Sequence, residues 1–286
     1  MAKSKSDDAG LDDLPPLRDV INAHGLIADK KFGQNFLFDS NITDKIARHA
    51  DIACGGLAGK NLIEIGPGPG GLTRSLLRSD ASSVTAIEFD PRAVGALQDL
   101  KEAASGRLEI IEADALEVDL TQISEAPRVI VANLPYNIAT PLLIGWLKQL
   151  RQDAGAYDAL ILMFQKEVAQ RICASSGSKA YGRLSVMSQW LCDCKKLFDL
   201  SPSAFTPPPK VTSSVVQFVP KMLDKDAPRF EDVESITAAA FGQRRKMIRS
   251  SLRDYSEAME ACGINQELRA ENLTALDYIK LAKFLS

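Results

Sequence analysis

Strand-like segments alternate with amphipathic segments through the first 220 residues of the chain. The strand-like segments occupy residues 62–65, 84–87, 108–111, 129–132, 158–164, 190–198 and 211–219. Helical patterns lie between them, as at residues 72–78, 91–104 and 166–174. This alternation predicts an α/β protein in which helices connect the strands of a parallel sheet.

The same pattern divides the chain into parts. Residues 1–14 are polar and predict a disordered tail, and residues 15–220 carry the α/β pattern. Residues 220–228 are polar and charged, which indicates a linker, and residues 229–286 show helical periodicity without a strand signal. We therefore expect a small helical domain at the C-terminus.

The first predicted strand runs directly into a cluster of glycines. Gly66, Gly68 and Gly71 fit the dinucleotide-binding pattern, whereas Glu64, Gly66, Gly68 and Gly70 fit the acid-x-Gly-x-Gly-x-Gly pattern of methyltransferases. We expect these glycines to adopt positive φ and to let backbone N–H groups approach a ligand, because glycine has no Cβ. A tight turn without a ligand is the alternative.

Acidic residues follow the next two predicted strands. Glu88 lies 22 positions after Gly66, and Asp114 follows the third strand. Because the carboxyl ends of parallel strands meet at one edge of the sheet, Glu88 can accept hydrogen bonds from the hydroxyl groups of a ribose. Asp114, one strand further out, can accept from an adenine amino group. The alternative for Glu88 is a solvated acid at a strand end.

The fourth predicted strand leads into Asn133, Leu134, Pro135 and Tyr136. An exocyclic adenine nitrogen is a poor nucleophile, since its lone pair is delocalised into the ring, so methyl transfer to it needs acceptors for its protons. The Asn133 side chain offers one carbonyl. Pro135 restricts Leu134 to an extended conformation that presents its backbone carbonyl, and the Tyr136 ring can stack on an extruded base. A proline-containing turn, with Asn133 capping the next helix, is the alternative.

Composition narrows the class of protein. The chain has 286 residues and a net charge of −3, so a nucleic-acid partner requires a local basic patch. No segment predicts a transmembrane helix or a signal peptide, and we expect a cytoplasmic protein. The five cysteines lack paired spacing, which argues against disulfides and a zinc site, and we expect no metal.

One basic patch follows the linker, at residues 241–253. If this segment is helical, Ile248, Leu252 and Tyr255 share an apolar face and Arg245, Arg249 and Arg253 form a basic stripe. We expect the patch to bind RNA phosphates. The expected RNA-binding residues are Arg244, Arg245, Lys246 and Arg249. In the alternative, the arginines only pair with nearby acids such as Asp254 and Glu257.

Lysines, amides and aromatic residues also interleave at residues 30–37, ahead of a helix expected to begin near Asp39 or Ser40. This segment is either a lid over a ligand or an arm whose phenylalanines only pack.

From residue 17 to the C-terminus, the chain resembles the KsgA-type small-subunit ribosomal RNA adenine dimethyltransferases. The matching blocks are residues 32–37, 64–68, 133–137, 165–167, 178–186, 205–211 and 241–246. The resemblance implies a Rossmann-like class I S-adenosylmethionine-dependent methyltransferase domain and a small helical C-terminal domain. The implied sheet is seven-stranded and mostly parallel, with one antiparallel strand.

The resemblance further implies an activity. The expected enzyme dimethylates two adjacent adenines in a hairpin near the 3′ end of 16S rRNA in the 30S subunit, and takes part in its biogenesis. We expect it to act as a monomer. The implied contacts with S-adenosylmethionine are Asn35, Leu37, Gly66, Glu88, Asp114 and Asn133, and Phe205 is placed across the target base from Tyr136. Alternatively, Phe205 is a core residue under a proline-rich loop.

Three other functions remain open from the residues. A large-subunit rRNA adenine dimethyltransferase of the resistance type shares the core motifs. A nucleic-acid-binding factor on the same fold would not need Asn133 and Tyr136. A nicotinamide-dependent dehydrogenase leaves Asp114 and the Asn-Leu-Pro-Tyr segment unexplained.

Overall fold

The computed structural model describes residues 10–26 and 35–285. The chain forms two compact units. The first comprises Met1–Leu143, Gly155–Lys166 and Leu197–Val219, and the second comprises Ile144–Ala154, Glu167–Lys196 and Pro220–Ser286. Two segments that the sequence pattern placed in the larger domain thus group with the C-terminal helices. The functional division at residues 220–228 stays a prediction.

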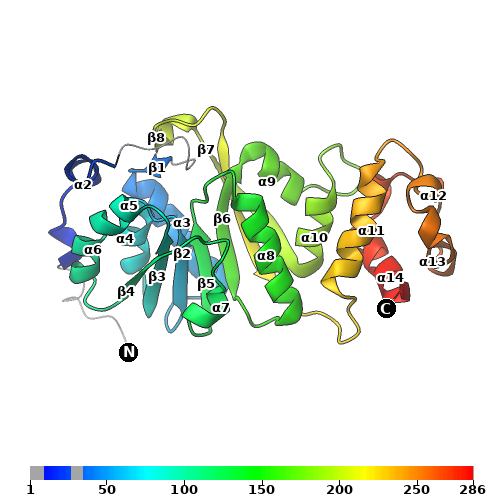
Figure 1. The fold of residues 1–286 in the computed structure, drawn as a ribbon, viewed down its shortest axis with the longest axis horizontal. Coiled ribbons are helices and arrows are strands. Elements are labelled where there is room, and N and C mark those ends of the chain that lie inside the picture. The colour runs from blue at the N-terminus through cyan, green and yellow to red at the C-terminus, as the bar shows by residue number, and fades with distance from the viewer. Residues whose placement is uncertain (1–9, 27–34, 286) are drawn as a thin grey trace. The chain divides into compact units, whose positions relative to one another are not determined.

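A seven-stranded sheet has the strand order β4-β3-β2-β5-β6-β9-β7 (Figure 1). The strands are β2 (Asn61–Ile65), β3 (Ser83–Glu88), β4 (Leu108–Glu112), β5 (Arg128–Ala132), β6 (Ala159–Gln165), β7 (Cys192–Leu200) and β9 (Ser213–Pro220). Strands β2 to β6 pair with one another in parallel, and β9 pairs antiparallel with the other edge of β6. The strand order reverses between β2 and β5, and ligands of open α/β sheets bind at such a point.

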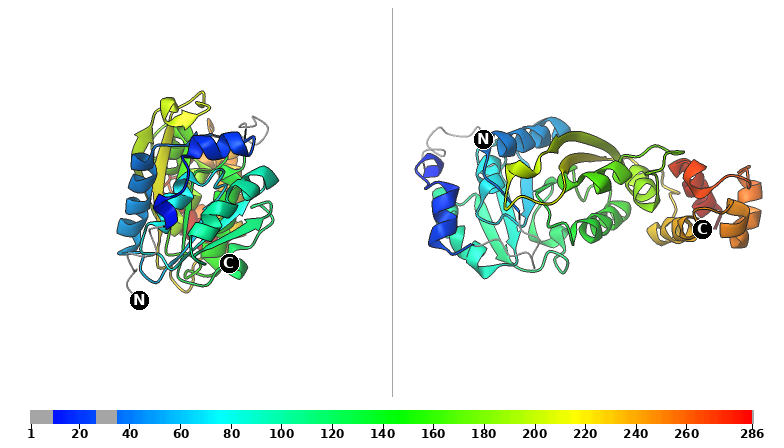
Figure 2. Two further views of the ribbon diagram at one scale, coloured as in Figure 1. Left: turned by 90° about the vertical axis from the view of Figure 1, so that its left-hand side faces the viewer. Right: turned by 90° about the horizontal axis from the view of Figure 1, so that it is seen from above.

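The first unit builds its core on the parallel strands. The last four residues of β2 and of β5 are all buried, because helices cover both faces of the sheet (Figures 1 and 2). The helices of this unit include α2 (Leu17–Ala23), α3 (Ser40–Cys54), α4 (Gly71–Leu77), α5 (Pro91–Ala96), α6 (Gln98–Ala103) and α7 (Leu120–Ile123). Asp39 caps α3 by accepting from the N–H of Asn41 at 2.9 Å, which confirms the expected start of this helix.

A short second sheet pairs β1 (Phe36–Leu37) with β8 (Phe205–Thr206), with Leu37 opposite Phe205. The turn η2 (Pro202–Ala204) precedes β8. This pairing lays the N-terminal segment against the proline-rich segment of the same unit.

The second unit is mainly helical. Its helices are α9 (Lys166–Ile172), α10 (Arg183–Leu191), α11 (Phe230–Gly242), α12 (Ile248–Ser251), α13 (Ser256–Ala261) and α14 (Ala275–Leu285), with short turns η3 (Arg253–Tyr255) and η4 (Ala270–Asn272). Helix α8 (Ala139–Gln152) begins in the first unit and ends in this one. In this unit Phe241 packs between two tyrosines. The centroid of the Phe241 ring lies 6.2 Å from that of Tyr181 and 5.7 Å from that of Tyr278.

Several sequence predictions need correction. The predicted helix at residues 91–104 is two helices that meet at Leu97. Trp190 lies in α10 and stacks on Phe230, so the strand predicted from residue 190 begins only at Cys192. The predicted disordered tail is wrong at Leu11, which is 1% exposed and packs into the core of the first unit.

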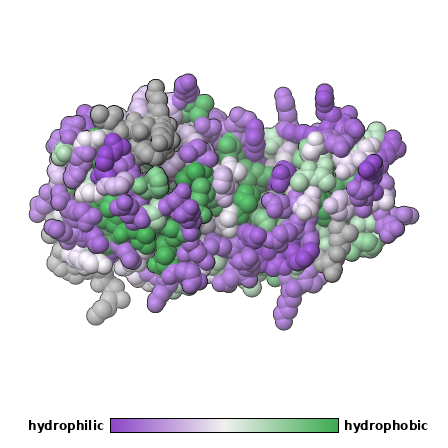
Figure 3. All heavy atoms as spheres, viewed as in Figure 1, coloured by the Kyte–Doolittle hydropathy of each residue, from purple (hydrophilic) through white to green (hydrophobic). Residues whose placement is uncertain are grey.

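No helix in the described part of the chain is long and apolar enough to cross a membrane. Hydrophilic side chains predominate on the face drawn in Figure 3. Large apolar side chains that remain exposed include Ile52, Phe89, Leu116 and Leu276.

Candidate cofactor and active site

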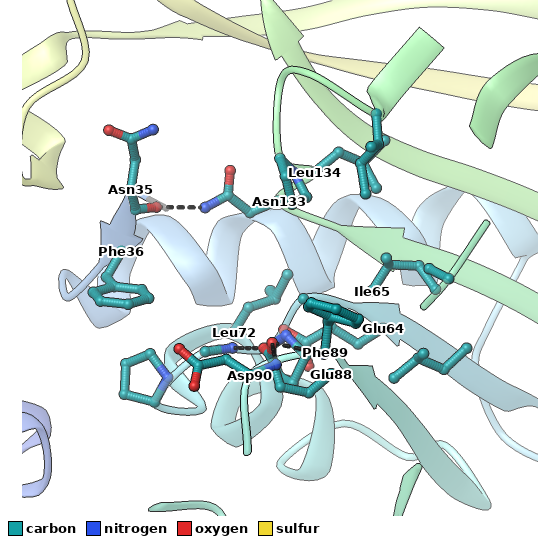
Figure 4. A pocket seen from close by; sticks show the side chains of 18 of the residues that line it. Asn35, Phe36, Glu64, Ile65, Leu72, Glu88, Phe89, Asp90, Asn133 and Leu134 are labelled. Atoms are coloured by element: carbon teal, nitrogen blue, oxygen red, sulfur yellow. Dashed lines mark hydrogen bonds between the residues drawn. The ribbon is translucent and has the colours of Figure 1, made fainter. Parts of the chain in front are cut away.

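A cavity of about 230 Å³ lies at the carboxyl ends of the parallel strands (Figure 4). Its walls include all six residues expected to contact a cofactor, namely Asn35, Leu37, Gly66, Glu88, Asp114 and Asn133. They come from β1 and the residue before it, from the end of β3, and from the segments after β2, β4 and β5. The fold therefore gathers these residues at one place, and their contacts with a cofactor stay predictions.

The glycine turn after β2 allows close packing against β1. Gly66 and Gly68 have φ of 66° and 54°, as expected. A Cβ on Gly68 would lie 2.7 Å from the Phe36 ring, and a Cβ on Gly71 would collide with the Leu37 carbonyl oxygen. The expected positive φ is wrong for Gly71, which opens α4 in a helical conformation and is needed for this close approach instead.

Glu88 is 6% exposed and is held by the glycine turn and its own helix start. Its Oε2 accepts from the N–H of Gly68 at 3.1 Å, and its Oε1 accepts from Phe89 and Asp90 at 2.9 Å each. Burial raises the pKa of this carboxyl, while the three N–H donors lower it. A carboxylate has about four acceptor positions, so Oε2 retains one for a ligand hydroxyl.

The cavity wall is acidic. Glu64, Glu88, Asp90 and Asp114 line it, and its described lining residues include no lysine, arginine or histidine. Arg92 forms an ion pair with Asp90 at 2.7 Å, but it does not line the cavity. Such a wall favours a cationic ligand and disfavours the pyrophosphate of a dinucleotide. This charge fits the sulfonium and ammonium groups of S-adenosylmethionine.

The backbone just before β1 orients the side chain of Asn133. Its side-chain nitrogen donates to the backbone carbonyl of Asn35 at 2.9 Å (Figure 4). The side-chain carbonyl of Asn133 therefore stays available as an acceptor. Leu134 beside it is 1% exposed, and its backbone is fixed by the following Pro135.

Tyr136 lines the same cavity and is half-buried. Its hydroxyl shares a hydrogen bond of 2.5 Å with Ser213, which is fully buried on β9. Burial raises the pKa of Tyr136, so the hydroxyl stays protonated at neutral pH. The bond to Ser213 fixes the ring at the cavity and leaves the ring, not the oxygen, for a substrate.

Phe205 is buried in the structure. It is 3% exposed and belongs to the core of the first unit together with Leu37 and Leu200. It is not among the described residues that line the cavity. Phe205 lies on β8, which pairs with β1. Its expected position across the target base from Tyr136 and the alternative of a core residue both stay predictions.

Phe89 is a site residue that the sequence analysis missed. It follows Glu88 directly, lines the cavity and is 57% exposed. An exposed aromatic ring beside a ribose acceptor is suited to stacking on a nucleobase. Its position after a strand-end acid is the signal that could have identified it.

The basic patch of the second unit differs from the predicted stripe. Helix α11 ends at Gly242, α12 begins only at Ile248, and α12 is four residues long. The prediction of one helix with arginines every four residues is therefore wrong. Of the three residues of the predicted apolar face, Ile248 and Leu252 are fully buried, whereas Tyr255 is only partly buried.

The predicted RNA-binding side chains fall into two groups. Arg245, Lys246 and Arg249 are exposed. Arg244 donates to the Lys179 carbonyl at 2.7 Å and pairs with Glu271 at 3.4 Å, so it ties segments of the unit together. The lysines and phenylalanine at residues 30–32 lie outside the described residues.

Fold and site together define a class I S-adenosylmethionine-dependent methyltransferase. The mostly parallel seven-stranded sheet, the acidic cavity at its switch point and the Asn-Leu-Pro-Tyr segment after β5 carry this assignment. Comparison with known proteins narrows this class to one family. The model of the ribosomal RNA adenine dimethylase family matches residues 26–286, and the chain belongs to that family.

Similar proteins agree with the family. The chain is 52% identical to the ribosomal RNA small subunit methyltransferase A of Rhodospirillum rubrum over 275 residues, which are 95% of this chain and 93% of that protein. It is also 52% identical to the protein of the same description from Paramagnetospirillum magneticum over 276 residues, covering 96% and 95%.

Solved structures confirm the predicted fold class. A dimethyladenosine transferase from Plasmodium falciparum superposes with a TM-score of 0.70 at 26% identity, covering 86% of this chain and 95% of that chain. The 23S rRNA methyltransferase ErmE superposes with a TM-score of 0.65 at 24% identity, covering 87% and 98%, which bears on the fold alone.

Proposed function

We propose that this protein dimethylates the exocyclic amino groups of two adjacent adenines in a hairpin loop near the 3′ end of 16S rRNA. It acts on the small ribosomal subunit during biogenesis, in the cytoplasm, and works as a monomer. Membership of the adenine dimethylase family supports the chemistry. The small-subunit description of its relatives at 52% identity supports the choice of 16S rRNA.

S-adenosylmethionine, when bound, supplies an electrophilic methyl group on its sulfonium. Glu88 holds the ribose through the free acceptor position of Oε2, and Asp114 holds the adenine amino group. Phe89 provides an apolar face beside them. The acidic wall stabilises the positive charge of the ligand.

The hydrogen bond between Asn133 and Asn35 is the observation that carries the proposed chemistry. It uses the amide nitrogen and leaves the amide carbonyl as an acceptor at the cavity. The carbonyls of Asn133 and Leu134 accept the two protons of the target amine and leave its lone pair directed away from them. Positive charge develops on this nitrogen during transfer, and fixed carbonyl dipoles stabilise it.

Tyr136 stacks on the extruded base and does not act as a base. Its buried hydroxyl is bonded to Ser213, and its raised pKa keeps it neutral. The second unit contributes Arg245, Lys246 and Arg249 as phosphate contacts, because their side chains are exposed.

Methylation of purified ribosomal particles tests this proposal. Undermethylated 30S subunits, 50S subunits and protein-free 16S rRNA are incubated with the protein and tritiated S-adenosylmethionine. We expect label in 30S subunits only or predominantly, with four methyl groups per particle, since two adenines each take two. Preferential label in 50S subunits would replace the proposal by the large-subunit alternative.

A further inference from the structure

Glu64 is a buried carboxyl at the cavity that the proposed function leaves without a role. It lies on β2, is 2% exposed and lines the cavity beside the residues described above (Figure 4). Its Oε2 has no hydrogen-bond partner among the described residues. In an ionised carboxylate at this position, the Thr73 hydroxyl would offset only part of the cost of desolvation. Buried carboxyls in such surroundings take up a proton instead.

No positively charged group among the described residues shifts the pKa of Glu64. Glu88 on the neighbouring β3 is the charged group that shifts its pKa, and it does so upward. On α4, the Thr73 hydroxyl lowers the pKa, and Asn133, which lines the same cavity after β5, is uncharged. Burial is the largest cause, and it raises the pKa of Glu64 to about 8.

The two other acids of the wall do not change this balance. Asp90 is already paired with Arg92, and Asp114 lies after β4, at the far side of β3 from Glu64. The cavity without a ligand therefore combines two adjacent buried carboxyls with no lining cation among the described residues. A bound cation would reverse the preference of Glu64, because opposite charge nearby favours the ionised form.

We propose that Glu64 carries a proton while the cavity holds no cation and releases that proton to solvent when S-adenosylmethionine binds. Glu64 then serves as a counter-ion to the positively charged methionine part of the ligand. No covalent bond of the ligand changes in this step, and one proton leaves for each ligand bound. The inference rests on S-adenosylmethionine being the cofactor and does not depend on which RNA is methylated.

This coupling sets the pH dependence of cofactor affinity. Below the pKa of the ligand-free state, binding must displace a proton, so the association constant rises by up to about tenfold for each pH unit. Above about pH 8 the carboxyl is already ionised, and this dependence ends. Affinity should therefore be weakest in mildly acidic buffer.

The ligand-free protein provides the first test. The folded pKa of Glu64 lies above the unfolded value, so the folded state binds the proton more tightly and loses stability as pH rises from about 5 to 8. Glu64→Gln lacks this titrating group. The free energy of unfolding of the variant minus that of wild type, measured with urea, should therefore increase as pH rises from about 5 to 8. Glu109→Gln, at an exposed position on β4, is the matched control and should show no such trend. A stability difference for Glu64→Gln that does not vary with pH would overturn the inference.

Calorimetric titration provides the second test. S-adenosylmethionine is titrated at pH 7 into wild type and Glu64→Gln in buffers of different ionisation enthalpy, which counts protons exchanged on binding. Wild type should release about one proton more than the variant. Adenosine, which lacks the cationic part, should give no difference.

Wild type alone also suffices if the variant does not fold. The measured count is corrected for the ligand's own α-ammonium group, whose free pKa is about 8. The remaining proton release should then approach zero above pH 9, where Glu64 is already ionised. Equal proton counts in both proteins, or a release by wild type that does not change with pH, would refute the coupling. Neither readout uses RNA, so the coupling and the proposed rRNA substrate can fail independently.

Discussion

The side-chain amide of Asn133 and the backbone carbonyl of Asn35 form a hydrogen bond of 2.9 Å, although 98 positions separate them in the chain. This bond connects the N-terminal segment with the strand end that presents the Asn-Leu-Pro-Tyr segment. It orients the one side-chain acceptor on which the proposed chemistry depends.

Asn133→Ala should reduce turnover more than it reduces binding of small subunits. The lost carbonyl stabilises positive charge that develops only during transfer, and removing one such preorganised group costs on the order of a hundredfold in rate. Single-turnover methylation at saturating S-adenosylmethionine measures this. Asn22→Ala, on an exposed position of α2, is the control. Normal single-turnover rates in Asn133→Ala would remove the residue from the chemistry.

Glu88→Gln should weaken S-adenosylmethionine binding by about tenfold to a hundredfold, because a hydrogen bond to a charged acceptor contributes about 1.5 to 3 kcal/mol. Gln is preferable to Ala here. Glu88→Ala would also leave the N–H groups of Gly68, Phe89 and Asp90 without their acceptor and so lower stability. Calorimetry on the folded Gln variant decides the matter, and an unchanged dissociation constant would exclude Glu88 from the cofactor site.

Tyr136 variants separate the ring from the hydroxyl. Tyr136→Phe loses the bond to Ser213 but keeps the ring, so methylation should fall by less than about tenfold. Tyr136→Ala loses stacking, which contributes about 1 to 3 kcal/mol per base, and should be clearly worse. The comparison uses methylation rates at limiting 30S subunits, and a larger loss in Tyr136→Phe than in Tyr136→Ala would contradict the stacking role.

Arg245→Ala combined with Arg249→Ala should weaken binding to small subunits and lower the slope of log affinity against log salt by about one unit per lost phosphate contact. Lys101→Ala combined with Lys225→Ala removes the same charge from exposed positions elsewhere and serves as the control. If both double variants behave alike, the effect reflects net charge only, and the exposed arginines of the second unit are not a specific contact.

The positions of the site residues could be predicted because each follows a locally recognisable apolar run. Glu88 ends β3, Asn133 follows β5 directly and Asp114 follows β4 by two positions, and parallel strands bring their carboxyl ends to one edge. The glycine turn was equally visible, because its conformation depends on glycine itself. These features could be predicted because they depend on residues that are close together in the chain.

The predictions that failed depend on contacts between distant residues. The segment at residues 241–253 has helical spacing, but Ile248 donates its N–H to Leu268 and Arg249 donates to Gln266, so the backbone cannot continue α11. Trp190 is helical where it packs against Phe230. None of these partners can be identified from the spacing of nearby residues.

The most direct measurement of the central claim is a map of the methylated product. Small subunits methylated by wild type and by Asn133→Ala are digested, and the fragments of 16S rRNA are sequenced by mass spectrometry. The account predicts two adjacent N6,N6-dimethyladenosines in a hairpin near the 3′ end with wild type, and little or none with the variant. Methyl groups at non-adjacent adenines, or on an atom other than N6, would contradict it.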